Sequence, residues 1–156
     1  MNKELRALNW KQPFATLMAH HKIETRVWKT DYRGFVLICA SKMEYTENQL
    51  IRISGLEQFN RITDVLKMEG RQNMLDLRGY AIAVGELIDC RPMEITDENP
   101  CFVQFNPQLY CHVYENVRRI KPIPWKGSLG WKKLHPEFMN QIEFLDVETV
   151  SLPDNN

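Results

Sequence analysis

The run from Phe35 to Ala40 is the feature that most restricts what this chain can fold into. Its six residues, Phe-Val-Leu-Ile-Cys-Ala, are all apolar, and three of them are β-branched or aromatic. A strand that is apolar on both faces must be covered on both sides. The chain therefore needs neighbouring strands beside this one and packed layers on each face of the resulting sheet.

Other segments have strand or helix patterns, and they do not alternate regularly. Strands are predicted at residues 5–10, 23–28, 80–90, 110–120 and 131–134, with a bulge at Gly85. Helices are predicted after Pro13, at the capping box Thr46-x-x-Gln49, around residues 59–66 and after Pro136. Residues 69–78 and 97–107 are predicted loops. This order indicates an α+β fold with a curled, partly closed antiparallel sheet.

Length and charge narrow the class of protein further. A chain of 156 residues is the size of one domain, which we expect over residues 1–145 with a tail at 146–156. Lys and Arg together number 20, as do Asp and Glu, which argues against a protein that coats polyanions. Residues 1–42 and 110–135 are nevertheless rich in bases. These two blocks either form one positive rim or lie on unrelated faces.

The remaining sequence signals mostly exclude classes of protein. No stretch is long and apolar enough to cross a bilayer and no apolar signal core follows Met1, so a cytoplasmic protein without membrane contact is expected. The four cysteines are irregularly spaced, which favours buried reduced thiols over a zinc site or a disulfide scaffold. Glycine-rich phosphate loops and metalloprotease or serine-hydrolase motifs are missing. We therefore expect no metal and no cofactor.

Residues 23–28 carry the clearest candidate chemistry. If this segment is a regular strand, Glu24, Arg26 and Trp28 share one face and Ile23 and Val27 share the other. A carboxylate, a guanidinium and an indole in a row suit a planar polar ligand such as a nucleobase. The alternative is an exposed face with a surface salt bridge. In either case truncation of Glu24 is expected to change stability by no more than about 0.5 kcal/mol.

Neighbouring residues extend this candidate site. His21 falls on the same helical face as Leu17 and is expected to be packed, whereas Lys22 projects differently and can reach a ligand. Ser41 and Lys42 end the buried strand, where polar side chains either line a site or only terminate the strand. Arg118 belongs to a basic stretch interleaved with Tyr and Trp, which is typical of single-stranded nucleic-acid binding and also of a core strand.

Several ordered segments together resemble the ASCH domain family, over most of residues 5–134. They are Leu8 to Ala15, Ile23 to Gly34, Val36 to Ser41, Gly85 to Cys90, Glu115 to Arg118, and the stretch Pro122-x-Pro124-x-Lys126-Gly127. The resemblance implies a PUA-like, partly closed β-barrel with helices flanking its mouth. It also implies a cleft that binds RNA or modified nucleotides beside the family motif G-x-K-x-x-E-x-R.

This chain departs from that motif in its first half. Glu24 and Arg26 match the last two positions, but the glycine position is Ala19 and the lysine position is His21, with Lys22 one place late. In small bacterial relatives that hydrolyse acetylated cytidine, the motif lysine and a threonine at the position of Glu24 resemble a catalytic pair. Because this chain has neither residue there, that activity is not carried over.

These observations lead to one expected function and two alternatives. The expected function is binding of RNA or a modified nucleotide beside Glu24 and Arg26. One alternative is a hydrolase acting on a nucleoside or RNA, with Glu24 as general base and His21 or Lys22 as its partner. The other is a protein-interaction module. The expected ligand-binding residues are Trp10, Lys11, Gln12, Lys22, Glu24, Arg26, Trp28, Ser41, Lys42 and Arg118.

Overall fold

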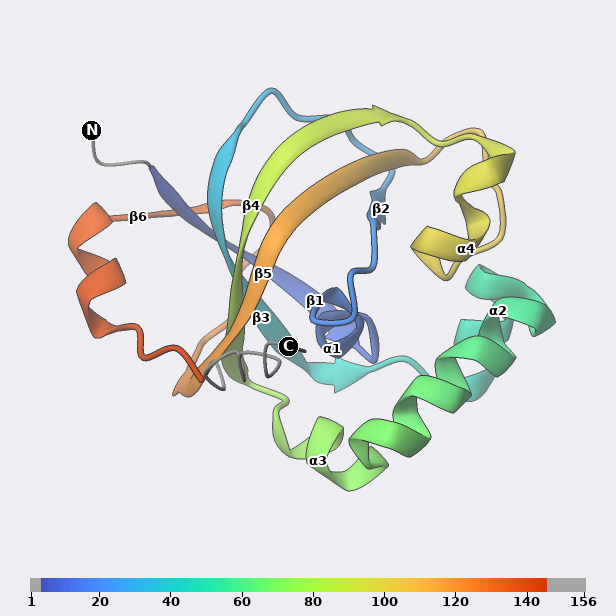
Figure 1. Cartoon of the computed structure of the whole chain (residues 1–156), viewed down its shortest axis with the longest axis horizontal. Coiled ribbons are helices and arrows are strands. Elements are labelled where there is room, and N and C mark those ends of the chain that lie inside the picture. The colour runs from blue at the N-terminus through green and yellow to red at the C-terminus, as the bar shows by residue number, and fades with distance from the viewer. Residues whose placement is uncertain (1–3, 146–156) are drawn as a thin grey trace, which may run out of the picture.

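In the computed structural model, which describes residues 4–145, six strands form one strongly curved sheet (Figure 1). The spatial order of the strands is β2-β5-β4-β3-β1-β6. Together with the helices, this sheet makes the fold α+β. The strands are β1 (Leu5–Gln12), β2 (Glu24–Arg26), β3 (Gly34–Glu44), β4 (Tyr80–Pro92), β5 (Tyr110–Pro124) and β6 (Lys132–Leu134).

The sheet is mixed, which corrects the expectation of an antiparallel sheet. Strands β1 and β3 run parallel, with Leu5 opposite Phe35, and the other pairings are antiparallel. A parallel pair needs a long crossover, and residues 13–33 supply it by way of a helix and strand β2. Strands β2 and β6 are the two edges, so strand pairing in residues 4–145 does not close the sheet into a barrel.

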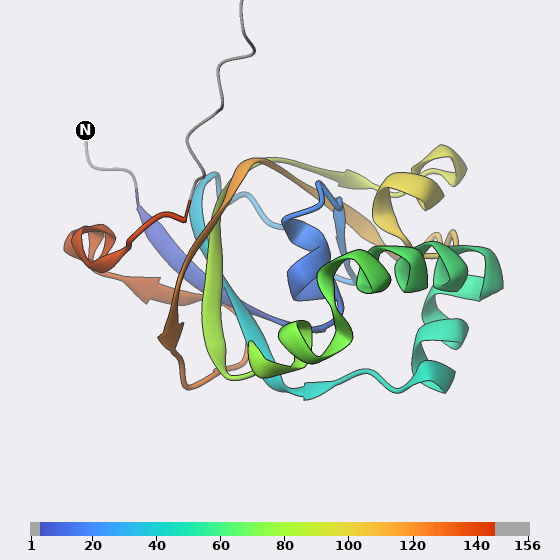
Figure 2. The same ribbon diagram turned by 60° about the horizontal axis from the view of Figure 1, so that its bottom comes forward.

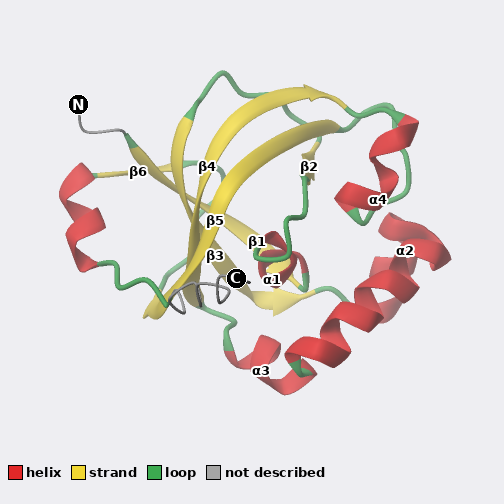
Figure 3. Ribbon diagram, in the orientation of Figure 1, coloured by secondary structure: helices red, strands yellow, loops and turns green. Residues whose placement is uncertain are grey.

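The helices lie on both sides of the sheet (Figure 3). Helix α1 lies between the sheet and α2, and η2 lies beside β6 on the opposite side (Figure 2). Within the described residues, no helix is long and apolar enough to cross a membrane. The helical segments are α1 (Phe14–Met18), α2 (Glu47–Glu69), α3 (Arg71–Asp76), η1 (Ile95–Asp97), α4 (Glu98–Cys101) and η2 (Pro136–Gln141).

Two of these helices occupy stretches predicted to be loops. Helix α3 forms within residues 69–78 because Met74 is buried and anchors a turn that is otherwise polar. Helix α4 forms within residues 97–107, where Cys101 is fully buried. Tertiary burial of a single side chain outweighed the loop-forming composition of each stretch.

Strand β3 is buried on both faces, as its sequence predicts. Val36 and Ile38 belong to a core cluster that also contains Leu17 of α1, whereas Leu37 and Cys39 belong to a second cluster on the other face. The first cluster lies between the sheet and the helices α1 and α2, and the second is covered by η2. Trp10 belongs to the first cluster, and Trp28 and Tyr114 pack against it.

The predicted bulge at Gly85 is confirmed. The register between β4 and β5 shifts between Val84 and Glu86. A Cβ atom on Gly85 would lie 2.9 Å from Cγ2 of Val117, so only glycine lets β5 approach this closely. A bulge increases the local twist of a strand.

The predicted capping box at the start of α2 is also confirmed, and its removal should be measurable. The Gln49 N–H donates to the Thr46 hydroxyl at 3.2 Å, and the Thr46 N–H donates to Oε1 of Gln49 at 2.9 Å. Thr46→Ala should lower the free energy of unfolding by about 1 kcal/mol in urea titrations. Thr63→Ala, which removes a mid-helix hydroxyl, is the control and should cost less. Equal effects would contradict a capping role.

Candidate functional site

Three charged side chains meet at the start of β2. The Lys22 ammonium lies 3.1 Å from Oε1 of Glu24, and the Arg26 guanidinium lies 3.2 Å from Oε2 of the same carboxylate. Both Lys22 and Glu24 are buried, while Arg26 is half-buried. Two cations and one carboxylate leave the cluster with one excess positive charge.

The turn after α1 explains how Lys22 enters the interior. Helix α1 ends at Met18, and His21 has a φ of 65°, a left-handed conformation that reverses the chain direction. The Lys22 ammonium then lies 4.7 Å from the ring centroid of Phe14. The expectation that His21 is packed is wrong, because this turn leaves His21 exposed and directs Lys22 inward instead.

Glu24 is also placed differently from the sequence-based expectation. Residues 23–28 do not form one regular strand: β2 spans only Glu24–Arg26, and the chain bends at Val27, which is 70% exposed. The side chain of Glu24 therefore points into the molecule and is only 3% exposed. The interior accepts this carboxylate because two cations and the Thr25 N–H, at 2.8 Å, surround it.

The surroundings of Glu24 keep it ionised. Burial by itself raises the pKa of Glu24, but attraction to Lys22 and Arg26 and the hydrogen bond from Thr25 together lower the pKa below its usual value. The carboxylate is therefore charged at neutral pH.

An aromatic wall stands beside this charged cluster. The Arg26 guanidinium carbon lies 5.1 Å from the ring centroid of Trp10, and the rings of Trp10 and Tyr114 meet edge to face with centroids 5.9 Å apart. Three buried polar atoms here have no hydrogen-bond partner among residues 4–145: Nε1 of Trp10, Nε of Arg26 and the hydroxyl of Tyr114. Buried polar groups are rarely left unpaired, so these three atoms distinguish this cluster from the surrounding core.

Trp28 borders the same wall, although its side chain is partly occupied by protein contacts. Its ring packs edge to face against His112 and Trp131, with centroids 4.9 and 5.7 Å away. The Trp28 carbonyl accepts a hydrogen bond of 2.8 Å from Nε2 of His112, which leaves Nδ1 with a buried and unpaired lone pair. Burial lowers the pKa of His112, so its ring is neutral at pH 7.

Lys11, Ser41 and Lys42 are three further residues for which the sequence predicts ligand binding. Lys11 lies near the charged cluster, with its ammonium 5.1 Å from the ring centroid of Tyr45. Burial raises the pKa of Tyr45, and Glu24 and Arg26 also act on its pKa, so Tyr45 lies within their electrostatic range. Ser41 is half-buried, and exposed Lys42 packs against Gly79 at the start of β4.

The sequence predicts a ligand-binding role for Gln12, and the structure engages its side chain within the framework. Its side chain is fully buried and its amide accepts from the Thr16 N–H at 2.9 Å. The same amide donates to the Thr16 hydroxyl at 2.8 Å and to the Met74 carbonyl at 3.3 Å. With these bonds made, Gln12 ties α3 to the end of β1 and has little capacity left for a ligand.

Arg118 lies on the other face of the sheet, so the expected shared positive rim is not formed. Its guanidinium stacks 3.8 Å from the ring centroid of Phe144, and its strand partner Val84 belongs to the second core cluster. Trp125 also packs on that face, against Phe138. Arg118 lies on the same strand as Tyr110, the β5 partner of Arg26, but register shifts between β4 and β5 fall between these two residues. Simple alternation of faces therefore does not hold along this stretch.

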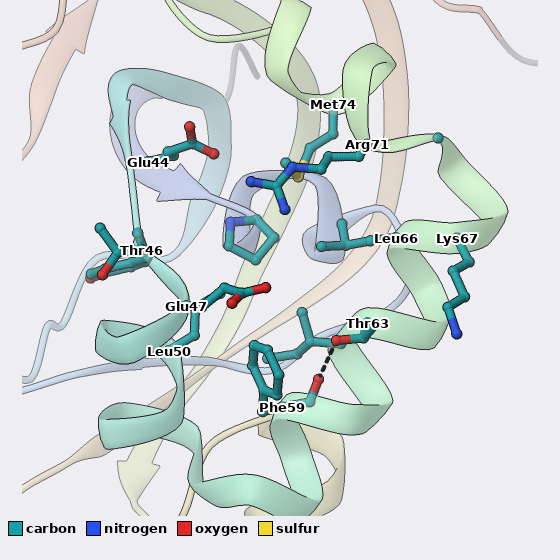
Figure 4. A pocket seen from close by; sticks show the side chains of 14 residues that line it. Glu44, Thr46, Glu47, Leu50, Phe59, Thr63, Leu66, Lys67, Arg71 and Met74 are labelled. Carbon is teal, nitrogen blue, oxygen red and sulfur yellow. Dashed lines mark hydrogen bonds between the residues drawn. The ribbon is translucent and has the colours of Figure 1, made fainter.

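A groove lies between α2, α3 and the end of β3, and Tyr45 lines it (Figure 4). Its volume is about 600 Å³, and its floor includes Leu50, Ile62 and Met74. Arg71 reaches into it from α3, and Glu47 faces it from the start of α2 (Figure 4). The sequence did not reveal this groove because α3 was expected to be a loop. A protein-interaction module would have room here for a partner segment.

The region next to α4 contains a strong ion pair whose pH dependence can be predicted. Arg91 donates to both carboxylate oxygens of Asp97, at 2.7 and 2.8 Å, and the pKa of Asp97 is lowered to about 2 from the usual 3.8. A lowered folded-state pKa gives stability that is present above about pH 4 and lost as pH falls through 2.

Asp97→Asn should therefore destabilise the protein at pH 7 by about 1 to 2 kcal/mol, a value kept low because solvent screens the half-exposed Arg91. The difference from wild type should shrink below pH 4 in urea titrations. A difference that stays constant down to pH 2 would contradict the ion pair.

Comparison with known proteins does not assign this site. No protein-family model matches the chain, and no curated protein matches it either. Over residues 4–145, no group of three or more His, Cys, Asp or Glu side chains is arranged to hold a metal ion. The interpretation of the site therefore rests on its own chemistry.

Proposed function

We propose that the protein binds a modified nucleotide through the cluster formed by Trp10, Lys22, Glu24, Arg26 and Tyr114. One observation carries the proposal: three buried and unpaired polar atoms surround an ionised carboxylate and an aromatic wall. A nucleobase is planar and carries carbonyl and ring-nitrogen acceptors as well as amino donors. The N–H groups and the hydroxyl suit its acceptors, the carboxylate suits its donors, and the guanidinium and indole suit its faces.

We also propose that the chain is an ASCH domain with a PUA-like, partly closed barrel. Its support is the sequence match at Glu24 and Arg26, together with the position of Lys22. Lys22 lies one place late in the motif, but its ammonium is buried against Glu24. The left-handed turn at His21 makes this possible, because it directs Lys22 into the interior.

A single nucleotide is favoured over a long RNA strand as the ligand. Binding a strand needs a continuous row of cations along its phosphates. Arg118 lies on the opposite face from Arg26, so the charges near the cluster come mainly from Lys11, Lys22 and Arg26. These can contact one base and its attached phosphate.

Identification of copurifying nucleotides tests the proposal. Mass spectrometry of extracts from purified protein should detect a modified nucleotide with the wild-type chain and much less with Glu24→Gln. Glu57→Gln, which changes an exposed carboxylate on α2, is the matched control and should retain it. Equal recovery from all three proteins would contradict binding at Glu24.

Hydrolysis of a modified nucleoside is the second candidate, and the contact between Lys22 and Glu24 favours it. A buried lysine 3.1 Å from a carboxylate can take part in proton transfer. Amide hydrolysis also requires an attacking group. The threonine that the related hydrolases place at position 24 is replaced here by an anion already engaged by two cations.

We therefore expect slow or no release of cytidine from N4-acetylcytidine. Chromatography of the reaction mixture measures this directly, and Lys22→Met supplies the background rate. Turnover at about 1 per second or more, lost in Lys22→Met, would contradict this expectation and make the protein a hydrolase.

A further inference from the structure

Two thiols face each other behind the candidate site. Sγ of Cys101 and Sγ of Cys111 are 3.7 Å apart, and both residues are fully buried. Cys101 is the last residue of α4, and Cys111 lies near the start of β5. A disulfide needs its sulfur atoms about 2.05 Å apart, so small side-chain rotations would bring this pair to bonding distance.

This pair is directly connected to the strand that carries Glu24. Cys111 is the β5 partner of Thr25, and the Ile23 N–H donates to the carbonyl of Pro100, next to Cys101, at 3.0 Å. The two cysteines therefore lie in the two segments that make backbone contacts with β2 and with Ile23 just before it. The other two cysteines lie elsewhere: Cys39 belongs to the second core cluster, and Cys90 is half-buried.

We propose that Cys101 and Cys111 are a site of reversible oxidation, at which a peroxide forms a disulfide that clamps α4 to β5 behind β2. This modification is independent of which ligand the protein binds. It requires only the two thiols and a peroxide from outside the protein.

The two cysteines have different roles in the reaction. The hydrogen bond from Cys101 lowers the pKa of Cys111, while the same contact and burial raise the pKa of Cys101. Cys111 is therefore the more acidic thiol of the two, and after losing its proton its sulfur attacks the peroxide oxygen. For hydrogen peroxide this yields a sulfenic acid and hydroxide, which takes up the proton that Cys111 lost and becomes water. The Cys101 sulfur then attacks the sulfenic sulfur and releases a second water. In total, two thiols and one hydrogen peroxide give one disulfide and two waters.

The oxidant must reach a buried pair, and α4 is the element that can open. It comprises only Glu98–Cys101 and ends at Phe102 in a left-handed conformation. Short elements open locally at a lower cost than unfolding of the whole domain, so oxidation should proceed in folded protein. Once formed, the disulfide closes a short loop and should raise the melting temperature by roughly 5 °C.

The test treats purified wild-type protein with hydrogen peroxide, then unfolds it and alkylates the remaining thiols. We expect two alkyl groups per chain instead of four, a mass lower by two hydrogens, and a peptide that links Cys101 to Cys111. Protein unfolded in urea and given the same dose shows that the dose is sufficient. Dithiothreitol should restore four alkylated thiols and the original melting temperature.

Matched variants separate this pair from general oxidation. Cys101→Ala and Cys111→Ala should each abolish the cross-link and the rise in melting temperature, whereas Cys90→Ala should retain both. The proposal is overturned if folded protein keeps four thiols at a dose sufficient for unfolded protein, or if the cross-link involves Cys90. A Cys101–Cys111 cross-link without any change in melting temperature would contradict the proposal that the disulfide clamps α4 to β5.

Discussion

Glu24→Ala is expected to lower the free energy of unfolding by about 3 kcal/mol or more. The change removes the carboxylate between two cations and leaves the Lys22 ammonium, whose side chain is fully buried, with only the Ile23 carbonyl at 3.0 Å. Removing one partner of a buried ion pair typically costs about 3–5 kcal/mol, because the other charge stays buried and unpaired. Urea titration monitored by tryptophan fluorescence measures the difference.

A double variant distinguishes the stability lost with the Lys22–Glu24 ion pair from the stability lost with side-chain packing. Lys22→Met combined with Glu24→Leu removes both buried charges and fills similar volume, so the double variant should be within about 1 kcal/mol of wild type. Arg26 retains its hydrogen bond of 2.8 Å to the Asn9 carbonyl in this variant. If Glu24→Ala alone cost about 0.5 kcal/mol or less, Glu24 would behave as the exposed residue that the strand pattern suggested.

Tyr114→Phe should weaken nucleotide binding about tenfold without destabilising the protein. The Tyr114 hydroxyl is buried and has no partner among the described residues, so its removal relieves an unpaired polar group and stability should stay equal or rise slightly. If a ligand supplies the missing hydrogen bond, the variant loses about 1.4 kcal/mol of binding free energy. Isothermal titration with nucleoside monophosphates measures the affinity.

Tyr32→Phe provides a matched comparison with the opposite result. The Tyr32 hydroxyl lies 2.8 Å from the Glu4 carbonyl and 2.6 Å from the Phe35 carbonyl, so its loss should cost about 1 kcal/mol of stability. Its hydroxyl is already satisfied, and ligand affinity should not change. A drop in stability for Tyr114→Phe equal to that for Tyr32→Phe would contradict the view that the Tyr114 hydroxyl is reserved for a ligand.

Local sequence patterns predicted those features that depend on neighbouring residues. The doubly buried strand around Val36 and Ile38, the capping box at Thr46 and the bulge at Gly85 all follow from side-chain type at short spacing. The two helical signals in residues 46–66 are also confirmed, because α2 is interrupted at Gly55, where φ is 77°. Each of these depends on propensity, capping or hydrophobic periodicity.

The arrangement of the candidate site could not be predicted in this way. The burial of Glu24 depends on a bend at Val27 and on cations that reach it from either side. The inward direction of Lys22 depends on one left-handed residue, His21, and positive φ is uncommon enough in residues other than glycine that the sequence gives little warning of it. Matching residues to the motif position by position cannot detect a lysine that is displaced by one place, as Lys22 is. Such matching assumes that the connection between the helix and the strand has the same length.

The most direct test of the central claim is the indole N–H signal of Trp10 in proton–nitrogen correlation spectra. The protein is titrated with N4-acetylcytidine 5′-monophosphate and with the four unmodified ribonucleoside monophosphates, and Trp10→Phe assigns the signal. A nucleotide should shift the Trp10 signal, because its unpaired Nε1 gains an acceptor, and should leave the signal of Trp125, on the other face of the sheet, unchanged. A nucleotide that shifts Trp125 while Trp10 stays constant would contradict the proposed site.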